Sequence, residues 1–134
     1  MKLPILFVDD DAATRELGVE ILRDVGYTVF EAGQVSEAIQ MLEDHPTTGL
    51  LFTDIHMPGR NGYFLADMAV TRWPHLRVLY TTGSPTTADN QRGSCHGEVL
   101  AKPYNAAQLS AAVAESLARS RPPNKWDEPH GRRP

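Results

Sequence analysis

The sequence is poor in the residue types on which several classes of protein depend. It has a single cysteine, Cys95, so no disulfide can form within the chain, and Cys95 with His96 makes no metal-ligand spacing with another Cys or His. We interpret Cys95 as an ordinary loop thiol. No segment approaches the roughly 18 apolar residues of a membrane span, and the N-terminal apolar run is too short for a signal peptide. We therefore expect a cytoplasmic protein with no membrane contact.

An excess of positive charge is missing from the main part of the chain, whose acidic balance argues against a nucleic-acid-binding face. The net charge is −4, and the stretch from Arg119 onward holds five Lys/Arg against Asp127 and Glu128, which leaves +3 there and −7 on the rest. With 41% hydrophobic residues in 134, the chain can fill one core. We expect one domain over residues 1–119 and a disordered tail over residues 120–134, where proline and charge dominate and Trp126 is the only large apolar side chain.

Short apolar runs alternate with helical patterns along the domain. Runs rich in Val, Leu and aromatic residues are typical of buried parallel strands, and they occupy residues 3–8, 27–32, 49–53, 77–82 and 98–101. Each is followed by a helical stretch, and right-handed crossovers place helices on both faces of such a sheet. The pattern predicts an α/β, flavodoxin-like doubly wound (βα)5 domain with a five-stranded parallel sheet in the order 2-1-3-4-5.

The helices differ in the strength of their signal. Leu17, Ile21 and Val25 recur every four residues, as do Leu109, Val113 and Leu117, and such repeats are typical of the buried stripe of an amphipathic helix. Helices are also predicted over residues 36–45, with Ser36 as the N-cap, and over residues 63–73. The fourth helix, within residues 84–93, has proline, threonine and glycine but almost no apolar stripe, so we expect it to be short or irregular.

The residues at the strand ends carry chemistry. Because the carboxyl ends of parallel strands share one edge of the sheet, residues distant in sequence meet there. Strand 2 ends in Glu31 and contributes nothing obvious, whereas the other four ends carry Asp9, Asp10 and Asp11; Asp54; Thr82 and Gly83; and Lys102 and Pro103. Neighbouring carboxylates raise one another's pKa unless a cation joins them, and Mg²⁺ suits such oxygen ligands. Asp11, which opens a helix, is interpreted as its N-cap.

Four motifs, "VDDD" (8–11), "TDIHMPGRNG" (53–62), "YTTG" (80–83) and "LAKPY" (100–104), together resemble the receiver domain of two-component response regulators, of the stand-alone, single-domain type. The resemblance implies that Asp54 accepts a phosphoryl group from a phosphohistidine of a sensor histidine kinase or a histidine phosphotransfer protein. It implies that Mg²⁺ is bound by Asp10, Asp54 and the backbone carbonyl of His56, with Asp9 acting mainly through water. A carboxylate nucleophile of this kind forms an aspartyl phosphate.

The same resemblance assigns roles around Asp54. Thr82 is the switch hydroxyl, Gly83 leaves room for the phosphoryl group, and Lys102 neutralises its charge from a loop in which the bond to Pro103 is cis. The side chains of His56 and Ser84 are expected to tune the lifetime of the phosphate.

The signal is expected to leave through phosphorylation-dependent binding of an unidentified protein target. A homodimer through the fourth helix, the fifth strand and the last helix is one form of that binding. The chain departs from the family at Val99, where receivers often carry an aromatic residue. No turnover of an external substrate is expected.

Two alternatives stay open. One is a receiver-like interaction module that works without phosphate, although it would have no need of the five site residues Asp9, Asp10, Asp54, Thr82 and Lys102. The other is a phosphatase with an aspartate nucleophile, similar to haloacid-dehalogenase-like enzymes. Those enzymes usually carry a second aspartate two residues after the nucleophile, where this chain has His56, and the sequence has no segment for a cap domain.

Overall fold

The computed structural model describes residues 3–83 and 96–118, and within these ranges strands and helices alternate. The predicted fourth helix, Ser84 and the predicted tail lie outside the described residues. The strands are β1 (Ile5–Val8), β2 (Val29–Ala32), β3 (Leu50–Asp54), β4 (Arg77–Thr82) and β5 (Gly97–Ala101). The helices are α1 (Ala12–Val25), α2 (Val35–Asp44), α3 (Gly62–Arg72) and α5 (Ala106–Ala118).

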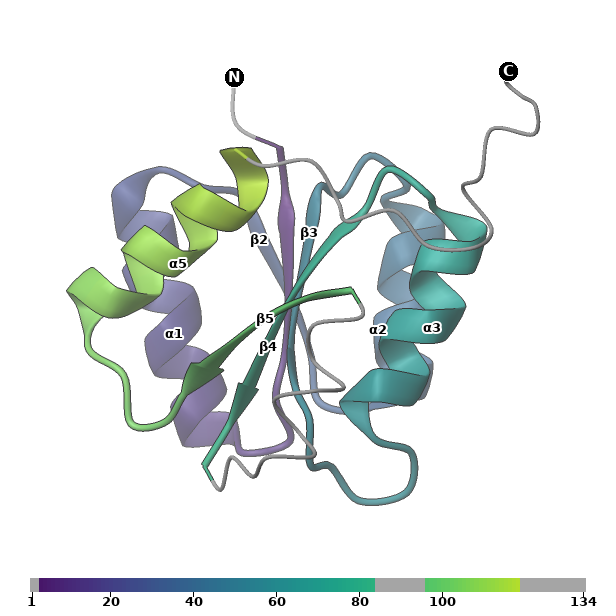
Figure 1. Cartoon of the computed structure of the whole chain (residues 1–134), viewed down its shortest axis with the longest axis horizontal. Helices are drawn as coiled ribbons and strands as arrows, with labels where there is room; N and C mark the ends of the chain where they lie inside the picture. The colour runs from purple at the N-terminus through teal and green to yellow at the C-terminus, as the bar shows by residue number, and fades with distance from the viewer. Residues whose placement is uncertain (1–2, 84–95, 119–134) are drawn as a thin grey trace.

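In the described part of the chain, five parallel strands form one sheet in the order β2-β1-β3-β4-β5. Helices α1 and α5 cover one face of this sheet and α2 and α3 cover the other (Figure 1). The predicted doubly wound fold and strand order are therefore confirmed. The order reverses between β1 and β3, and in such sheets ligands bind beside the carboxyl ends of the strands at that switch point.

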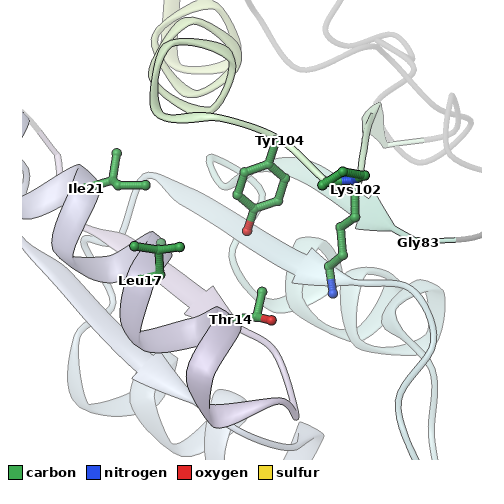
Figure 2. A pocket seen from close by; sticks show the side chains of 8 residues that line it. Thr14, Leu17, Ile21, Gly83, Lys102 and Tyr104 are labelled. Carbon is green, nitrogen blue, oxygen red and sulfur yellow. The ribbon is translucent and has the colours of Figure 1, made fainter.

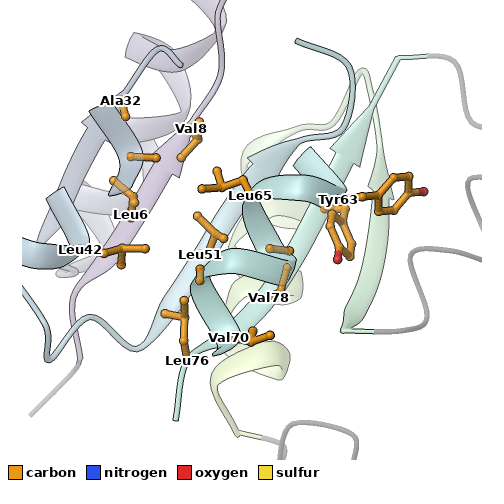
Figure 3. Close-up of a cluster of buried hydrophobic side chains, with 14 of the residues drawn as sticks. Leu6, Val8, Ala32, Leu42, Leu51, Tyr63, Leu65, Val70, Leu76 and Val78 are labelled. Atoms are coloured by element: carbon orange, nitrogen blue, oxygen red, sulfur yellow. The ribbon is translucent and has the colours of Figure 1, made fainter. Parts of the chain in front are cut away.

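The sheet carries a hydrophobic core on each face. Every residue of β1 and β3 is buried, as expected for central strands covered on both sides. The core under α2 and α3 contains Leu6, Leu51, Leu65 and Val78 (Figure 3). The opposite core, under α1 and α5, is built from side chains that alternate with these along the strands, among them Ile5, Phe7, Leu50, Phe52 and Leu79. The two cores hold the strand ends in a fixed register.

The predicted buried stripe of α1 is wrong at two of its three positions, since only Ile21 packs against the core. Leu17 is 60% exposed and Val25 is 44% exposed, whereas the buried residues of the helix are Gly18, Val19 and Leu22. A Cβ on Gly18 would lie 2.3 Å from Cζ of Phe7, so glycine is needed where α1 packs on the ring of Phe7 in β1. The stripe was misplaced because a glycine at the centre of the buried face carries no apolar signal. In α5 the prediction was right, since Leu109 and Val113 are fully buried and Leu117 packs against the same core.

The predicted N-cap of α2 is also wrong. Gln34 holds the N-cap position and Ser36 lies inside the first turn. Glu37 compensates from within the helix, because its carboxylate accepts a hydrogen bond from the backbone N–H of Gly33 at 2.8 Å. An acidic side chain in the first turn also suits the positive end of the helix dipole.

No helix within residues 3–83 and 96–118 is long and apolar enough to cross a membrane.

Candidate functional site

Three carboxylates gather at the carboxyl edge of the sheet, beside the switch point. In the register of the sheet, Val8 of β1 lies opposite Thr53 of β3, so Asp9 and Asp54 follow side by side. One carboxylate oxygen from each of Asp9, Asp10 and Asp54 lies within 4.8 Å of the other two. The cluster that the sequence predicted is therefore assembled in space, with hard oxygen donors of the kind that bind Mg²⁺.

Asp9 is the buried member of this cluster. Its side chain has no exposed surface, and both carboxylate oxygens are engaged. Oδ1 accepts a hydrogen bond from the backbone N–H of Asp11 at 3.0 Å, and Oδ2 accepts one from Nζ of Lys102 at 3.0 Å. Asp10, by contrast, is exposed. The two neighbours thus differ in environment, since hydrogen bonds hold the carboxylate of Asp9 whereas Asp10 faces solvent.

Lys102 bridges the two buried carboxylates from the loop after β5. Its Nζ lies 3.0 Å from Oδ2 of Asp9 and 3.1 Å from Oδ2 of Asp54. Its backbone N–H donates to the carbonyl of Thr82 at 2.8 Å, and the peptide bond to Pro103 is cis. Burial lowers the pKa of Lys102, but the hydrogen bonds and charges of Asp9 and Asp54 outweigh burial and raise it above its usual value. The ammonium is therefore a permanent positive charge at the site.

Asp54 ends β3 and is 6% exposed. Burial raises its pKa above the usual value, and the charge and hydrogen bond of Lys102 offset only part of that shift. Oδ1 of Asp54 accepts a hydrogen bond from the backbone N–H of His56 at 3.2 Å, while the side chain of His56 itself is exposed. A second cation beside Asp54 would therefore favour its ionised, nucleophilic form.

The loop after Asp54 is closed by backbone contacts that need glycine. Gly62 donates its backbone N–H to the carbonyl of Ile55 at 2.8 Å. A Cβ on Gly62 would lie 2.3 Å from the carbonyl oxygen of Asp54. Asn61 caps α3, since its side-chain oxygen accepts from the N–H of Phe64 at 2.9 Å. These contacts bring the start of α3 against the end of β3 and hold the backbone of Asp54 in place.

The end of β4 supplies the remaining predicted residues. Thr82 is fully buried at the last position of the strand, and Thr81 beside it donates its hydroxyl to the carbonyl of Leu100 at 2.7 Å. A Cβ built on Gly83 would meet no described atom within 4 Å, so the described residues leave space next to the end of this strand.

Asp11 is the N-cap of α1, as predicted. Its carboxylate accepts hydrogen bonds from the N–H of Thr14 at 2.9 Å and from the Thr14 hydroxyl at 2.5 Å. The hydroxyl, followed by the N–H, lowers the pKa of Asp11 below its usual value. Because Thr14 already engages this carboxylate, it serves the helix rather than the acidic cluster.

Sequence reasoning missed a contribution from the second strand. Glu31, which was expected to contribute nothing, pairs with Arg15 of α1 at 3.2 Å. Arg15 in turn donates from Nη1 to the backbone carbonyl of Asp9 at 2.8 Å. The sequence hinted at this pair only by placing Arg15 one turn into the helix after the aspartates and Glu31 at the end of a neighbouring strand.

A cavity of about 440 Å³ opens beside the cluster, between α1 and the loop after β5. Leu17 and Ile21 line it from α1, and Lys102 and Tyr104 line it from the other side (Figure 2). The Tyr104 hydroxyl is buried and has no hydrogen-bond partner among the described residues. Burial, followed by the negative charge of Asp9, raises the pKa of Tyr104 to about 12, so the phenol stays neutral. This wall of the site is largely apolar.

Comparison with known proteins agrees with this geometry. Response regulator receiver protein CpdR of Brucella abortus (strain 2308) is 31% identical over 115 residues, which are 84% of this chain and 95% of CpdR. Aerobic respiration control protein ArcA of Escherichia coli (strain K12) is 30% identical over 118 residues, which are 87% of this chain and 49% of ArcA. The chain thus spans about half the length of ArcA, one of the curated relatives that it matches.

Solved structures support the same assignment. The crystal structure of a CheY-like response regulator receiver domain protein from Methanospirillum hungatei JF-1 superimposes with a TM-score of 0.80 at 27% identity, over 87% of this chain and 94% of that one. Residues 5–114 match the response regulator receiver domain as a family. Together with the acidic cluster, Lys102 and the sheet order, this match shows that the chain belongs to the receiver domain family of two-component response regulators.

Proposed function

We propose that Asp54 accepts a phosphoryl group from a phosphohistidine of a sensor histidine kinase or a histidine phosphotransfer protein. The observation that carries the proposal is the position of its carboxylate, at a buried strand end beside the carboxylates of Asp9 and Asp10 and 3.1 Å from the ammonium of Lys102. An oxygen of Asp54 attacks phosphorus, the P–N bond to the donor histidine breaks, and the leaving imidazole takes up a proton. Water later attacks the same phosphorus and returns the carboxylate and inorganic phosphate, so the chain turns over no other substrate.

The acidic cluster fits a magnesium ion. We propose that Asp10, Asp54 and the backbone carbonyl of His56 bind it directly, while Asp9 acts through water. The occupied oxygens of Asp9 support this division, because they already accept hydrogen bonds from Asp11 and Lys102. When bound, the ion supplies positive charge against the oxygens of the transferring phosphoryl group. Mg²⁺ suits the role because it keeps part of its shell for water and phosphate oxygens.

The other predicted residues have proposed roles around the same phosphoryl group. Lys102 neutralises one of its oxygens, its cis bond to Pro103 sets the direction of the ammonium, and Thr82 supplies the switch hydroxyl. The open space beside Gly83 supports a role in admitting the group. His56 is exposed two residues after Asp54, which supports a part in tuning the phosphate lifetime. Ser84 is proposed for the same tuning role on its place in the sequence alone.

The phosphodonor is proposed to dock on the apolar surface next to the cavity. Leu17 is exposed on α1, and Ile21 lies one turn further along the same side. Together with Pro103 and Tyr104 they line the cavity that Lys102 also lines. Apolar side chains left in water beside a reactive centre are a common feature of binding surfaces.

The phosphorylated chain is proposed to signal in the cytoplasm by binding a protein target or a second copy through a face that includes β5 and α5. Val99 stands where an aromatic switch residue is frequent, and here it packs against the core under α2 and α3. Transmission is therefore proposed to depend on Thr82 and the segment that follows it. The boundary between residues 1–119 and the tail, and the single-domain organisation, remain predictions.

Phosphorylation with acetyl phosphate tests the assignment of Asp54. Intact mass should rise by one phosphoryl group in the presence of Mg²⁺ and should not rise with a chelator or in Asp54→Asn. Asp24→Asn, which makes the same chemical change on the exposed side of α1, is the matched control and should be labelled like wild type. Equal labelling of Asp54→Asn and wild type would refute the assignment. Complete absence of labelling in wild type would favour the phosphate-independent module, and sustained hydrolysis of added phosphomonoesters would favour the phosphatase.

A further inference from the structure

Every polar group of Asp9 is engaged, including its backbone. The N–H donates to the carbonyl of Ala32 at 3.2 Å, and the carboxylate oxygens accept from Asp11 and Lys102. The backbone carbonyl accepts from Nη1 of Arg15 at 2.8 Å. This last contact falls outside the sheet ladder and is made by a side chain from α1. The carbonyl that accepts this hydrogen bond lies in the peptide bond that joins Asp9 to Asp10.

The guanidinium of Arg15 is itself held in place. Its Nε donates to Oε1 of Glu31 at 3.2 Å, and the Arg15 side chain is 22% exposed. Gly33 leaves room for it, since a Cβ there would lie 3.1 Å from Nη1 of Arg15. Arg15 therefore ties the end of β2 to the end of β1 while remaining anchored on α1. A planar guanidinium with several fixed donors can make both contacts at once, which an ammonium on a flexible stem does less well.

We propose that Arg15, oriented by Glu31, is a positioning residue for the magnesium site. The carbonyl of Asp9 belongs to the peptide unit that joins Asp9 to Asp10, and a peptide unit is planar. Holding that oxygen therefore restricts the backbone nitrogen and Cα of Asp10. Asp10 is exposed, and no hydrogen bond or ion pair among the described residues holds its side chain, so its placement depends on its backbone. This inference rests on the proposed metal site, and it adds two residues that do not touch the ion.

Charge and positioning predict opposite effects for Arg15. Its guanidinium is a positive charge near the acidic cluster, so if charge alone mattered, Arg15→Gln would bind Mg²⁺ more tightly. If positioning dominates, the freed peptide unit must be ordered again when the ion binds. Ordering one residue of backbone corresponds to about a fivefold to thirtyfold loss of affinity. We expect the positioning effect to win, because the ion pair with Glu31 already offsets the charge of Arg15.

Magnesium titration by calorimetry, at a temperature where all variants are folded, tests this inference. Arg15→Gln, whose shorter side chain cannot reach the Asp9 carbonyl, should bind Mg²⁺ about fivefold to thirtyfold more weakly than wild type. Arg15→Lys and Glu31→Gln should show smaller losses in the same direction. Arg72→Gln is the matched control, because it removes the same charge from an ion pair with Glu43 on the other face of the sheet. It should bind as wild type does.

Hydrogen exchange of the metal-free protein gives an independent readout. The N–H of Asp11, which donates to Asp9, should exchange faster in Arg15→Gln but not in Arg72→Gln. Unchanged or tighter Mg²⁺ binding by Arg15→Gln would overturn the inference and leave the proposed function intact. Should Arg15→Gln fail to fold, Arg15→Lys with wild-type affinity would overturn it equally. If wild type and Asp54→Asn both fail to bind Mg²⁺, the proposed metal site itself falls, and the inference falls with it.

Discussion

Replacement of Lys102 by methionine isolates the charge that holds the site together. Methionine keeps most of the apolar stem that lines the cavity and removes the ammonium that lies 3.0 Å from Asp9 and 3.1 Å from Asp54. Loss of one partner from a buried ion pair costs about 3–5 kcal/mol, because the remaining charge is left buried and uncompensated. Lys102 is 22% exposed while Asp9 is not exposed at all, so we place the loss near the lower limit, at about 3 kcal/mol.

The predicted loss depends on what else can compensate the carboxylates. A domain with a stability of about 5–15 kcal/mol would still fold, with a melting temperature lower by roughly 12 °C. Mg²⁺ should restore most of the loss, because it binds the folded cluster, and saturation at about one hundred times the dissociation constant contributes about 2.7 kcal/mol. The variant should also bind Mg²⁺ more tightly than wild type, since the ammonium no longer competes for the carboxylates.

Acidification should restore stability by a second route. Burial already raises the pKa of Asp54, and without Lys102 the pKa rises further. A carboxyl whose pKa is raised in the folded state binds more protons there than in the unfolded chain, so its contribution to stability grows as the pH falls from the folded pKa toward about 4. Thermal melts at several pH values, with and without Mg²⁺, measure both effects. A loss of stability that neither Mg²⁺ nor acid relieves would refute this reasoning and would make Lys102 a packing residue.

Further predictions follow from individual contacts. Gly62→Ala should lose about 3 kcal/mol in denaturant unfolding, because its Cβ would lie 2.3 Å from the Asp54 carbonyl, whereas Gly83→Ala, with open space around its Cβ, should change stability by less than about 0.5 kcal/mol. Equal losses of stability in the two variants would contradict the conclusion that a Cβ is tolerated at Gly83 and not at Gly62. Tyr104→Phe should leave the melting temperature unchanged or raise it, since it removes a buried hydroxyl without a partner. Because the pKa of Tyr104 is raised to about 12, wild type should lose stability between about pH 10 and 12 as unfolded tyrosine ionises, and the variant should lose less. The pKa of Asp54 is raised in the folded state, so the free energy of unfolding of metal-free wild type should fall as the pH rises above about 4. Bound Mg²⁺ should abolish this dependence of stability on pH.

The sequence by itself determined the fold and the identity of the clustered carboxylates. Strand-length apolar runs that alternate with helical stretches admit few arrangements, because parallel strands need crossovers and the crossovers are right-handed. The topology then requires that the ends of β1 and β3 meet, and Asp9, Asp10 and Asp54 meet with them. Asp11 could be interpreted as a cap because capping is a local property of the backbone.

Only the tertiary structure decided which side chains hold those carboxylates and which face of α1 is buried. Arg15, Glu31 and Asp9 are joined by contacts between separate elements, and no local pattern encodes the rotamer that makes an arginine reach a particular carbonyl. The burial of Gly18 could not be predicted from apolar periodicity, because glycine has no apolar side chain. It is buried because only a residue without a Cβ fits against Phe7. The periodicity of apolar residues predicts which side chains fill a core. Close contacts at glycine and hydrogen bonds between separate elements depend on distances that are set only when the helices and strands pack together.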